Sequence, residues 1–164
     1  MDVKETHALT KVKVYKFLLN LIFALTLFCI DRFSKIYIIE LSEKTGVTEI
    51  YLTSFLNSYL VWNTGIAFGL FSLSNELTYN LFTALIAIIN LIIIYLVVVT
   101  KDFRKYFFLL ILGGSFGNLF DRLYYRSVPD FIDFHIGNFH WFIFNIADIF
   151  ITVGVICLIL AEVL

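Results

Sequence analysis

The sequence predicts an α-helical integral membrane protein, a four-transmembrane-helix bundle with a small extracytoplasmic β-sheet. Of its 164 residues, 60% are hydrophobic and only 15% are charged, and the mean hydropathy is +0.91. A typical soluble domain has about 25% charged residues. Four apolar segments with short connections would fill most of one compact domain. The net charge of -1 provides no field that attracts nucleic acid, so we expect no nucleic-acid partner.

The four apolar segments predict membrane spans at approximately residues 14–39, 79–99, 104–123 and 140–162 of a single domain, residues 1–164. Each span should be helical, because an open strand leaves backbone polar groups unpaired in lipid. The first span follows several lysines, as a secretory signal does. No small-residue cleavage site ends it, so we expect it to be retained. The third contains Gly113, Gly114 and Gly117, which permit close helix packing.

The basic residues predict the orientation of these spans. Seven of them lie before the first span or between the second and third: Lys4, Lys11, Lys13, Lys16, Lys101, Arg104 and Lys105. Only three lie in the other two connections: Lys44, Arg122 and Arg126. This distribution predicts a multi-pass protein with both termini in the cytoplasm. The outer connections, residues 40–75 and 124–139, then face the periplasm or the cell exterior.

The outer connections contain β-favouring runs and one proline. Thr48–Leu52 and Tyr59–Trp62 predict a small sheet on the membrane surface, and Pro129 fixes a turn in the second connection. Cys29 and Cys157 lie inside apolar runs, which is typical of packed hydrophobic residues and not of a disulfide.

Asp148 is the most informative residue, because a carboxylate inside a span costs at least ~2.5–3.5 kcal/mol and indicates a functional site. It lies eight residues into the fourth segment, about 12 Å below the start of a helix that begins at 140. This depth corresponds to the outer leaflet, within reach of the outer connections. The structural alternative is a packing carboxylate paired with Arg122 or Arg126.

A second carboxylate, Asp130 or Asp133, should come close to Asp148 from the outer connection. Two carboxylates that share one site cannot both ionise easily, so one keeps its proton. The ionised member can activate water while the other donates a proton, which suffices for peptide hydrolysis without a metal or cofactor. Zinc bound by Asp130, Asp133, His135 and His140 is the weaker alternative, because no His-Glu-x-x-His helix is present. Histidines beside aromatic residues are more typical of a membrane interface.

Other polar residues inside the spans have structural and functional interpretations. The Asn118 and Asn145 amides could link helices or hold a substrate backbone. Asp31 and Lys35 are four residues apart and should form an ion pair on one helix face. Asp121 and Arg122 should anchor the outer end of the third span.

Five motifs together resemble bacterial lipoprotein signal peptidases, the signal peptidase II family. They are Asp31–Lys35 (DRFSK), Asn63–Gly69 (NTGIAFG), Gly113–Arg122 (GGSFGNLFDR), Val128–Phe131 (VPDF) and Phe144–Asp148 (FNIAD). Each motif is short, but all five occur in this order over nearly the whole chain. Pro129 before Asp130 and Ile149 after Asp148 are minor departures, and neither removes a reacting group.

The resemblance implies that Asp130 and Asp148, and not Asp133, are the catalytic pair of an aspartic endopeptidase. It implies cleavage of diacylglyceryl-modified prolipoproteins before the lipidated cysteine, by a monomer in the bacterial inner membrane with no cofactor or metal. Residues 40–75 would form a β-cradle and a mobile outer helix. Substrate binding or support of the site is implied for Asn63, Gly65, Asn118, Arg122 and Asn145.

Two other functions fit the residues less well. A small ion-coupled transporter or channel subunit would use Asp31, Asp121 and Asp148 as a relay, but the second span contains no charge. A non-catalytic assembly protein would use the glycine-rich third segment as its packing face.

Overall fold

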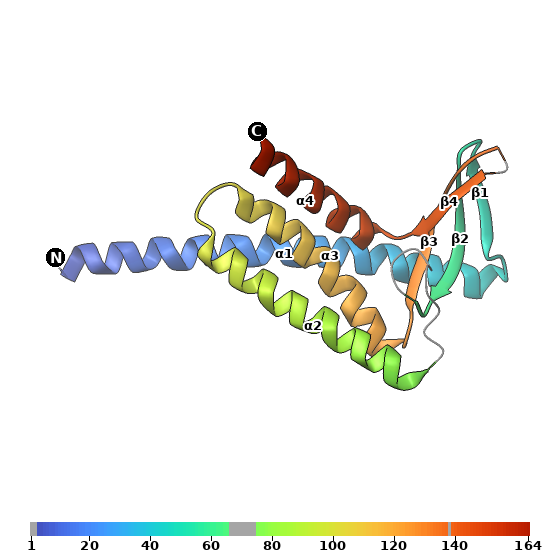
Figure 1. The fold of residues 1–164 in the computed structure, drawn as a ribbon, viewed down its shortest axis with the longest axis horizontal. Helices are drawn as coiled ribbons and strands as arrows, with labels where there is room; N and C mark the ends of the chain where they lie inside the picture. The colour runs from blue at the N-terminus through green and yellow to red at the C-terminus, as the bar shows by residue number, and fades with distance from the viewer. Residues whose placement is uncertain (1–2, 66–74, 138) are drawn as a thin grey trace.

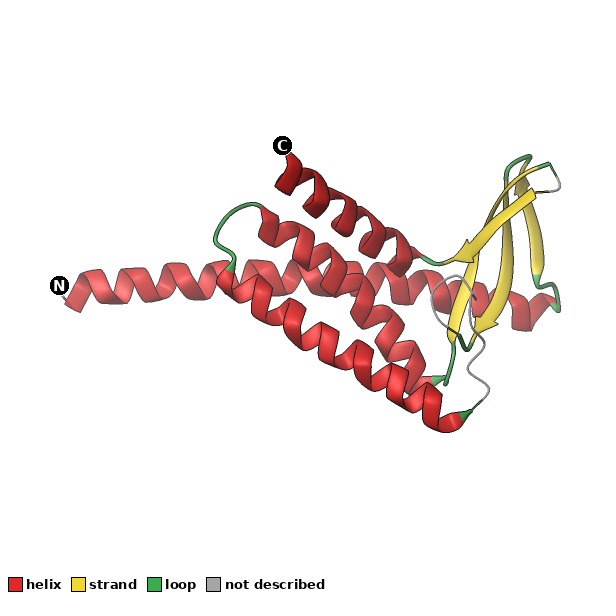
Figure 2. Ribbon diagram, in the orientation of Figure 1, coloured by secondary structure: helices red, strands yellow, loops and turns green. Residues whose placement is uncertain are grey.

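The computed structural model describes residues 3–65, 75–137 and 139–164, which form four helices and one four-stranded sheet (Figures 1 and 2). The elements follow in the order α1 (Val3–Thr45), β1 (Glu49–Thr53), β2 (Leu56–Asn63), α2 (Glu76–Val99), α3 (Arg104–Tyr124), β3 (Val128–Ile136), β4 (Phe139–Phe144) and α4 (Ile146–Val163). Figure 1 shows both termini and the α2–α3 connection toward one end of the molecule, and the sheet at the opposite end.

Helix α3 is the centre of the bundle, because it packs against α1, α2 and α4. Its glycines allow this close approach. A Cβ atom on Gly114 would overlap the backbone carbonyl of Ala147 in α4, and one on Gly117 would overlap the carboxylate of Asp31 in α1. The predicted packing role of this glycine-rich segment is therefore confirmed.

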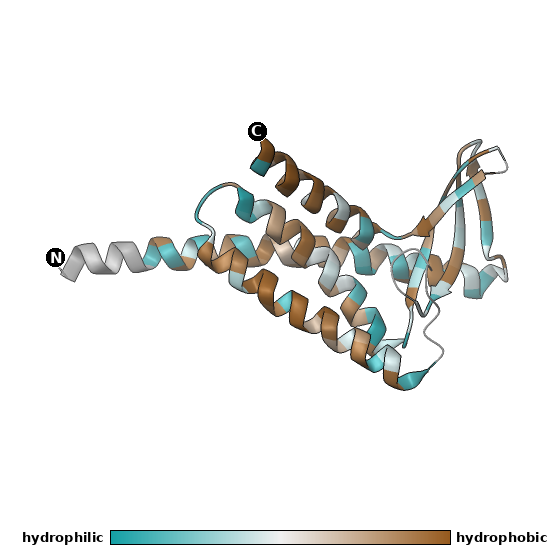
Figure 3. Cartoon of the chain, in the orientation of Figure 1, coloured by the Kyte–Doolittle hydropathy of each residue, from teal (hydrophilic) through white to brown (hydrophobic). Residues whose placement is uncertain are grey.

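Three helical segments are long and apolar enough to cross a membrane: Lys11–Thr45, Glu76–Val99 and Ile146–Val163. Apolar residues cover much of these helices in Figure 3. Helix α3 does not meet this criterion, because it carries polar and charged residues that lie buried against its neighbours, among them Ser115, Asp121 and Arg122. The prediction of helices with the character of membrane spans is confirmed for three of four segments.

The sheet is antiparallel with strand order β1-β2-β3-β4. The two predicted β-favouring runs correspond to β1 and β2. The prediction of a helix from residue 140 is wrong, because His140–Phe144 belong to β4 and pair with β3. Asp148 consequently lies in the first turn of α4, and not two turns deep in a helix.

Local signals define the helix ends near the sheet. Helix α1 ends before Gly46, whose φ of 67° lies in the left-handed region that glycine adopts without a steric clash. Helix α4 begins after Asn145, whose side chain accepts a hydrogen bond from the backbone N–H of Asp148. The resemblance implied an outer helix within residues 40–75. Residues 40–65 contain no such separate helix after the end of α1. Residues 66–74, and with them the end of the Asn63–Gly69 motif, lie outside the described residues.

Candidate active site

Asp130 and Asp148 line the same cavity, which has a volume of about 250 Å³. Asp130 comes from β3 and is only 3% exposed, whereas Asp148 comes from the first turn of α4 and is partly buried. The wall also includes the polar residues Asn63, Ser115, Asn118, Arg122, Asn145 and Thr152 and several apolar residues of α2 and α4. Two carboxylates therefore face one partly open cavity between the sheet and the helices.

Asn145 connects the two carboxylates. Its side-chain amide donates to Asp130 Oδ1 at 2.6 Å, and its backbone N–H donates to Asp148 Oδ2 at 3.1 Å. Its side-chain oxygen accepts from the backbone N–H of Asp148 at 3.1 Å, which completes a capping box. Because Asn145 is fully buried between β4 and α4, it fixes both carboxylates to one short segment.

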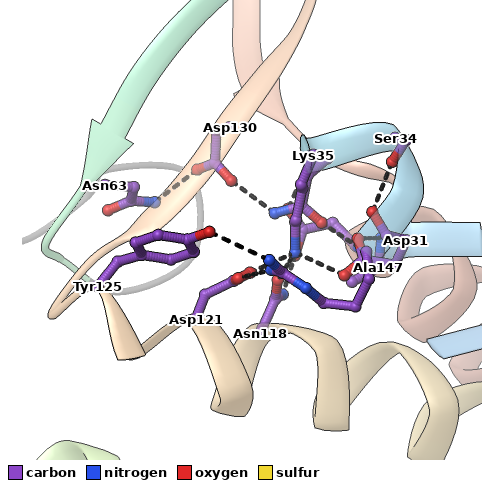
Figure 4. A network of polar contacts seen from close by, with 12 residues as sticks. Asp31, Ser34, Lys35, Asn63, Asn118, Asp121, Tyr125, Asp130 and Ala147 are labelled. Atoms are coloured by element: carbon purple, nitrogen blue, oxygen red, sulfur yellow. Dashed lines mark hydrogen bonds and ion pairs between the residues drawn. The ribbon is translucent and has the colours of Figure 1, made fainter. Parts of the chain in front are cut away.

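A second amide holds Asp130 from the end of β2. Asn63 Nδ2 donates to Asp130 Oδ2 at 2.8 Å (Figure 4). The Asn63 oxygen accepts from the Gly65 N–H at 2.8 Å, and the Gly65 carbonyl accepts from Arg122 Nη2 at 2.7 Å. Arg122 thus positions Asn63 through the backbone of Gly65.

Asp148 is held by Asn118 of α3. Asn118 Nδ2 donates to Asp148 Oδ1 at 2.8 Å, and its oxygen accepts from Lys35 Nζ at 2.9 Å. The Lys35 contact fixes which end of the amide faces the carboxylate, so that Asn118 presents its donor to Asp148.

A buried ionic cluster lies beneath the carboxylates and joins α1, α3 and α4 (Figure 4). Lys35 Nζ lies 2.8 Å from Asp31 Oδ2 and 2.7 Å from Asp121 Oδ2, and all three side chains are fully buried. Arg32 pairs with the other oxygen of Asp121. Asp31 Oδ1 accepts the backbone N–H of Ala147 at 2.9 Å, which satisfies a free donor at the start of α4. The predicted Asp31–Lys35 ion pair is confirmed.

The environment of Asp130 favours its neutral form. Burial, and after it the negative charge of Asp148, raise the pKa of this carboxyl from 3.8 to about 7. The hydrogen bonds from Asn63 and Asn145 act in the opposite direction but are weaker. A proton can therefore be held at this position near neutral pH, as an acid–base pair requires.

The structure also distinguishes the catalytic candidates from the other carboxylates considered in the sequence. Asp133 is bonded to His140 and does not line the cavity. The arginine pairing expected in the structural alternative for Asp148 is wrong, because its side-chain hydrogen bonds come from Asn118 and Asn145. Arg122 instead donates to the Gly65 carbonyl, and Arg126 contacts Asn80 and Glu76. The ion-relay alternative is weakened, because the charges of Asp31 and Asp121 are balanced by Lys35 and Arg32.

Sequence reasoning missed two features of the site. The Asn-x-x-Asp spacing of Asn145 and Asp148 is a capping signal that would have moved the helix start to 146. The pairing of Arg32 with Asp121 was also missed, although a charge within an apolar segment requires a buried partner.

Known proteins match this chain over most of its length. Residues 23–164 match the family model "Peptidase_A8: Signal peptidase (SPase) II". The lipoprotein signal peptidase of Pelagibacter ubique (strain HTCC1062) is 51% identical over 154 residues, which cover 94% of this chain and 93% of the relative. That of Anaplasma phagocytophilum (strain HZ) is 40% identical over 149 residues, which cover 90% and 93%.

Two solved structures of bacterial membrane enzymes, determined by the in meso method, share the fold. One, at 2.3 Å resolution, has a TM-score of 0.72 and 31% identity, and the match covers 88% of this chain and 87% of that one. The other, at 1.9 Å, has a TM-score of 0.69 and 34% identity, with coverage of 87% and 91%. The resemblance carried by the five motifs is confirmed by these matches.

Proposed function

The chain belongs to the signal peptidase II family of membrane aspartic endopeptidases, and we propose that it removes signal peptides from diacylglyceryl-modified prolipoproteins, with Asp130 and Asp148 as its catalytic pair. The observation that carries this assignment is the single cavity lined by both carboxylates, which Asn145 joins by hydrogen bonds. Cleavage occurs immediately before the lipidated cysteine.

The proposed reaction needs one proton shared by the pair. The ionised carboxylate accepts a proton from a water molecule, and the oxygen of that water attacks the carbonyl carbon of the scissile peptide bond. The protonated carboxyl donates its proton to the carbonyl oxygen. The tetrahedral intermediate then collapses: the carboxyl that accepted the water proton gives it to the departing amine, and the other carboxylate takes back a hydroxyl proton of the intermediate as the carbonyl re-forms, which restores the starting protonation of the pair. The raised pKa of Asp130, about 7, lets the pair hold this proton near neutral pH in the free enzyme.

Asn63, Gly65, Asn118, Arg122 and Asn145 support the site in this proposal. All five form hydrogen bonds that lead to a carboxylate, either directly or through Asn63. Arg122 retains free donors, because its Nε and Nη1 are buried and have no hydrogen-bond partner within the described ranges. These donors could bind a peptide carbonyl that enters the cavity.

We further propose that all four helices span the membrane, that both termini are cytoplasmic, and that the sheet and the cavity face outward. Helix α3 crosses as the central helix, where its polar residues contact protein and not lipid. A diacylated substrate would then reach the cavity by lateral diffusion, with its scissile bond near the outer surface. The protein acts as a monomer and needs no cofactor.

Cleavage of a purified diacylglyceryl-prolipoprotein in detergent tests the catalytic pair. Asp130→Asn and Asp148→Asn should each lower kcat by about 10²–10⁴-fold, because each removes one half of the acid–base pair. Asp102→Asn, at an exposed carboxylate between α2 and α3, should retain wild-type activity. Thermal unfolding verifies that each variant is folded. Near-normal turnover by either folded pair variant would refute the mechanism.

A further inference from the structure

A second cluster of chemically capable side chains lies on the sheet, outside the cavity. Asp133 and His135 belong to β3, and His140 of β4 lies directly opposite His135 in the strand register. One ligand atom from each of the three residues lies within 4.8 Å of the others. None of the three lines the cavity that contains the two catalytic candidates.

The strand geometry explains why these side chains converge. Residues two apart on a strand point to the same face, which places Asp133 beside His135. Directly opposed residues of an antiparallel pair also share a face, which adds His140. The two imidazole rings stack with centroids 5.1 Å apart, and His140 Nδ1 lies 2.8 Å from Asp133 Oδ2.

Unpartnered polar atoms at this position indicate a missing ligand. His135 is 8% exposed, and its Nδ1 is buried with no hydrogen-bond partner among the described residues. Asn57 of β2 lies opposite Asp133, and its Oδ1 is likewise buried and unpartnered in the described part of the chain. A buried polar atom without a partner costs about 1–3 kcal/mol, so two of them beside a carboxylate require an explanation.

We propose that Asp133, His135 and His140 bind a divalent transition-metal ion, with Zn²⁺ the best match. Two imidazole nitrogens and one carboxylate oxygen form a three-ligand set typical of Zn²⁺ sites that keep an open fourth position for water. Ligand atoms around such an ion lie closer together than 4.8 Å, since each is about 2.0–2.2 Å from the metal. The His140 side chain is 54% exposed and can rotate inward to close the set.

The role of this site is structural. The ion would clamp β3 to β4, and these two strands carry Asp130 and lead into Asn145. Water would occupy the open position. This proposal replaces the expectation that the protein holds no metal. Of the four zinc ligands considered from the sequence, it keeps Asp133, His135 and His140 and leaves out Asp130.

Metal titration of protein without a polyhistidine tag tests the site directly. Protein stripped with EDTA and desalted should bind one Zn²⁺ per chain in calorimetry, and Co²⁺ should give visible absorption of a site with nitrogen ligands. His140→Gln and Asp133→Asn should weaken Zn²⁺ binding by about 10-fold or more. His7→Gln, which changes a histidine near the start of α1, should bind as the wild type does.

Thermal unfolding provides a second measurement. Zn²⁺ should raise the Tm of the wild type and of His7→Gln, because the ion binds the folded state, and at the same concentration it should raise the Tm of His140→Gln clearly less. His140 is the preferred position, because a half-exposed side chain can be replaced without disturbing the fold. Absence of Zn²⁺ binding by the wild type, or equal binding by His140→Gln and Asp133→Asn, would overturn the proposal.

Discussion

Asn145 shows how one residue can position both carboxylates of a candidate acid–base pair. Its amide donates to Asp130, and its backbone N–H donates to Asp148. Asn145 also caps α4, so the bonds that start this helix are the same bonds that orient one carboxylate. The hydrogen bonds that Asp130 accepts lower its pKa, but burial raises the pKa by more than these bonds lower it. The site is therefore arranged to hold one proton near neutral pH.

The pH dependence of cleavage should reflect this proton. We expect kcat/KM to fall as pH rises through about 7, because Asp130 then loses the proton that the carbonyl oxygen needs. The measurement is the initial rate at low substrate concentration over a pH series in detergent. A rate that stays constant from pH about 6 to about 9 would contradict the role of Asp130.

The raised pKa of Asp130 also makes the free energy of unfolding depend on pH. The folded pKa is raised, so the folded state keeps a proton that the unfolded state has lost between pH 3.8 and about 7. The stabilisation that this proton gives the folded state is fully present below pH 3.8, the pKa of Asp130 in the unfolded chain. It is lost as pH rises through about 7, the pKa of Asp130 in the folded protein. Asp130→Asn resembles the protonated form, so its stability relative to the wild type should increase over this range. Asp102→Asn is the control and should show no such change.

At the residue scale, the sequence alone supported some functional residues and left others open. A carboxylate within an apolar segment pointed to Asp148, because burial of a charge is expensive. Asp130 and Asp133 could not be separated by spacing, since both lie in one connection. Only the register of β3 with its neighbours directs Asp130 toward Asn63 and Asp133 toward His140. That choice rested on the motif resemblance.

At the element scale, α1 carries two ion pairs of the same spacing in opposite environments. Asp31 and Lys35 are fully buried, whereas Glu40 and Lys44 are exposed to solvent. Both pairs place the acid four residues before the lysine, so their local helix geometry is matched. Among the described residues, only the buried pair forms an ion pair with another element, through Asp121 of α3.

Lys35→Met should destabilise the fold strongly, by about 3–5 kcal/mol, because Asp31 then remains buried without its counter-charge. Lys44→Met is the matched control and should leave the unfolding free energy unchanged within error, since solvent screens the exposed pair. Unfolding in detergent, followed by circular dichroism, measures both variants. Equal stability of the two variants would show that the buried cluster does not hold α1 to α3.

The elements themselves were predictable to different degrees. Helices α2 and α3 follow from their apolar runs, and α1 continues to Thr45 because Gly46 is the first residue that stops it. The β4 strand was missed because Phe139–Phe144 is apolar apart from His140, and a short, mostly apolar run does not distinguish a strand from a helix. Pairing with β3 decides the outcome, and β3 is itself held in the sheet by β2, which is distant in sequence.

At the scale of the whole molecule, the helical end and the sheet end differ in chemistry. Both termini and the α2–α3 turn lie toward one end, where Arg104 of α3 pairs with Glu162 near the end of α4 (Figure 1). The sheet, the cavity and the two catalytic candidates lie toward the other end. Basic residues are concentrated at the first end, which predicts that it faces the cytoplasm.

Cysteine labelling in cells tests this orientation. Cys29 and Cys157 are both free, and their replacement by Ala provides a background without cysteine. In that background, Ser54→Cys in the β1–β2 turn should react with a membrane-impermeant maleimide when the inner membrane is intact. Lys101→Cys in the α2–α3 turn should react only after the inner membrane is opened, because the basic residues around it stay in the cytoplasm. Both positions are exposed, so a difference in labelling reports the side of the membrane and not burial. The reverse pattern would place the sheet and its carboxylates in the cytoplasm, where a diacylated substrate with its scissile bond at the outer surface could not reach them.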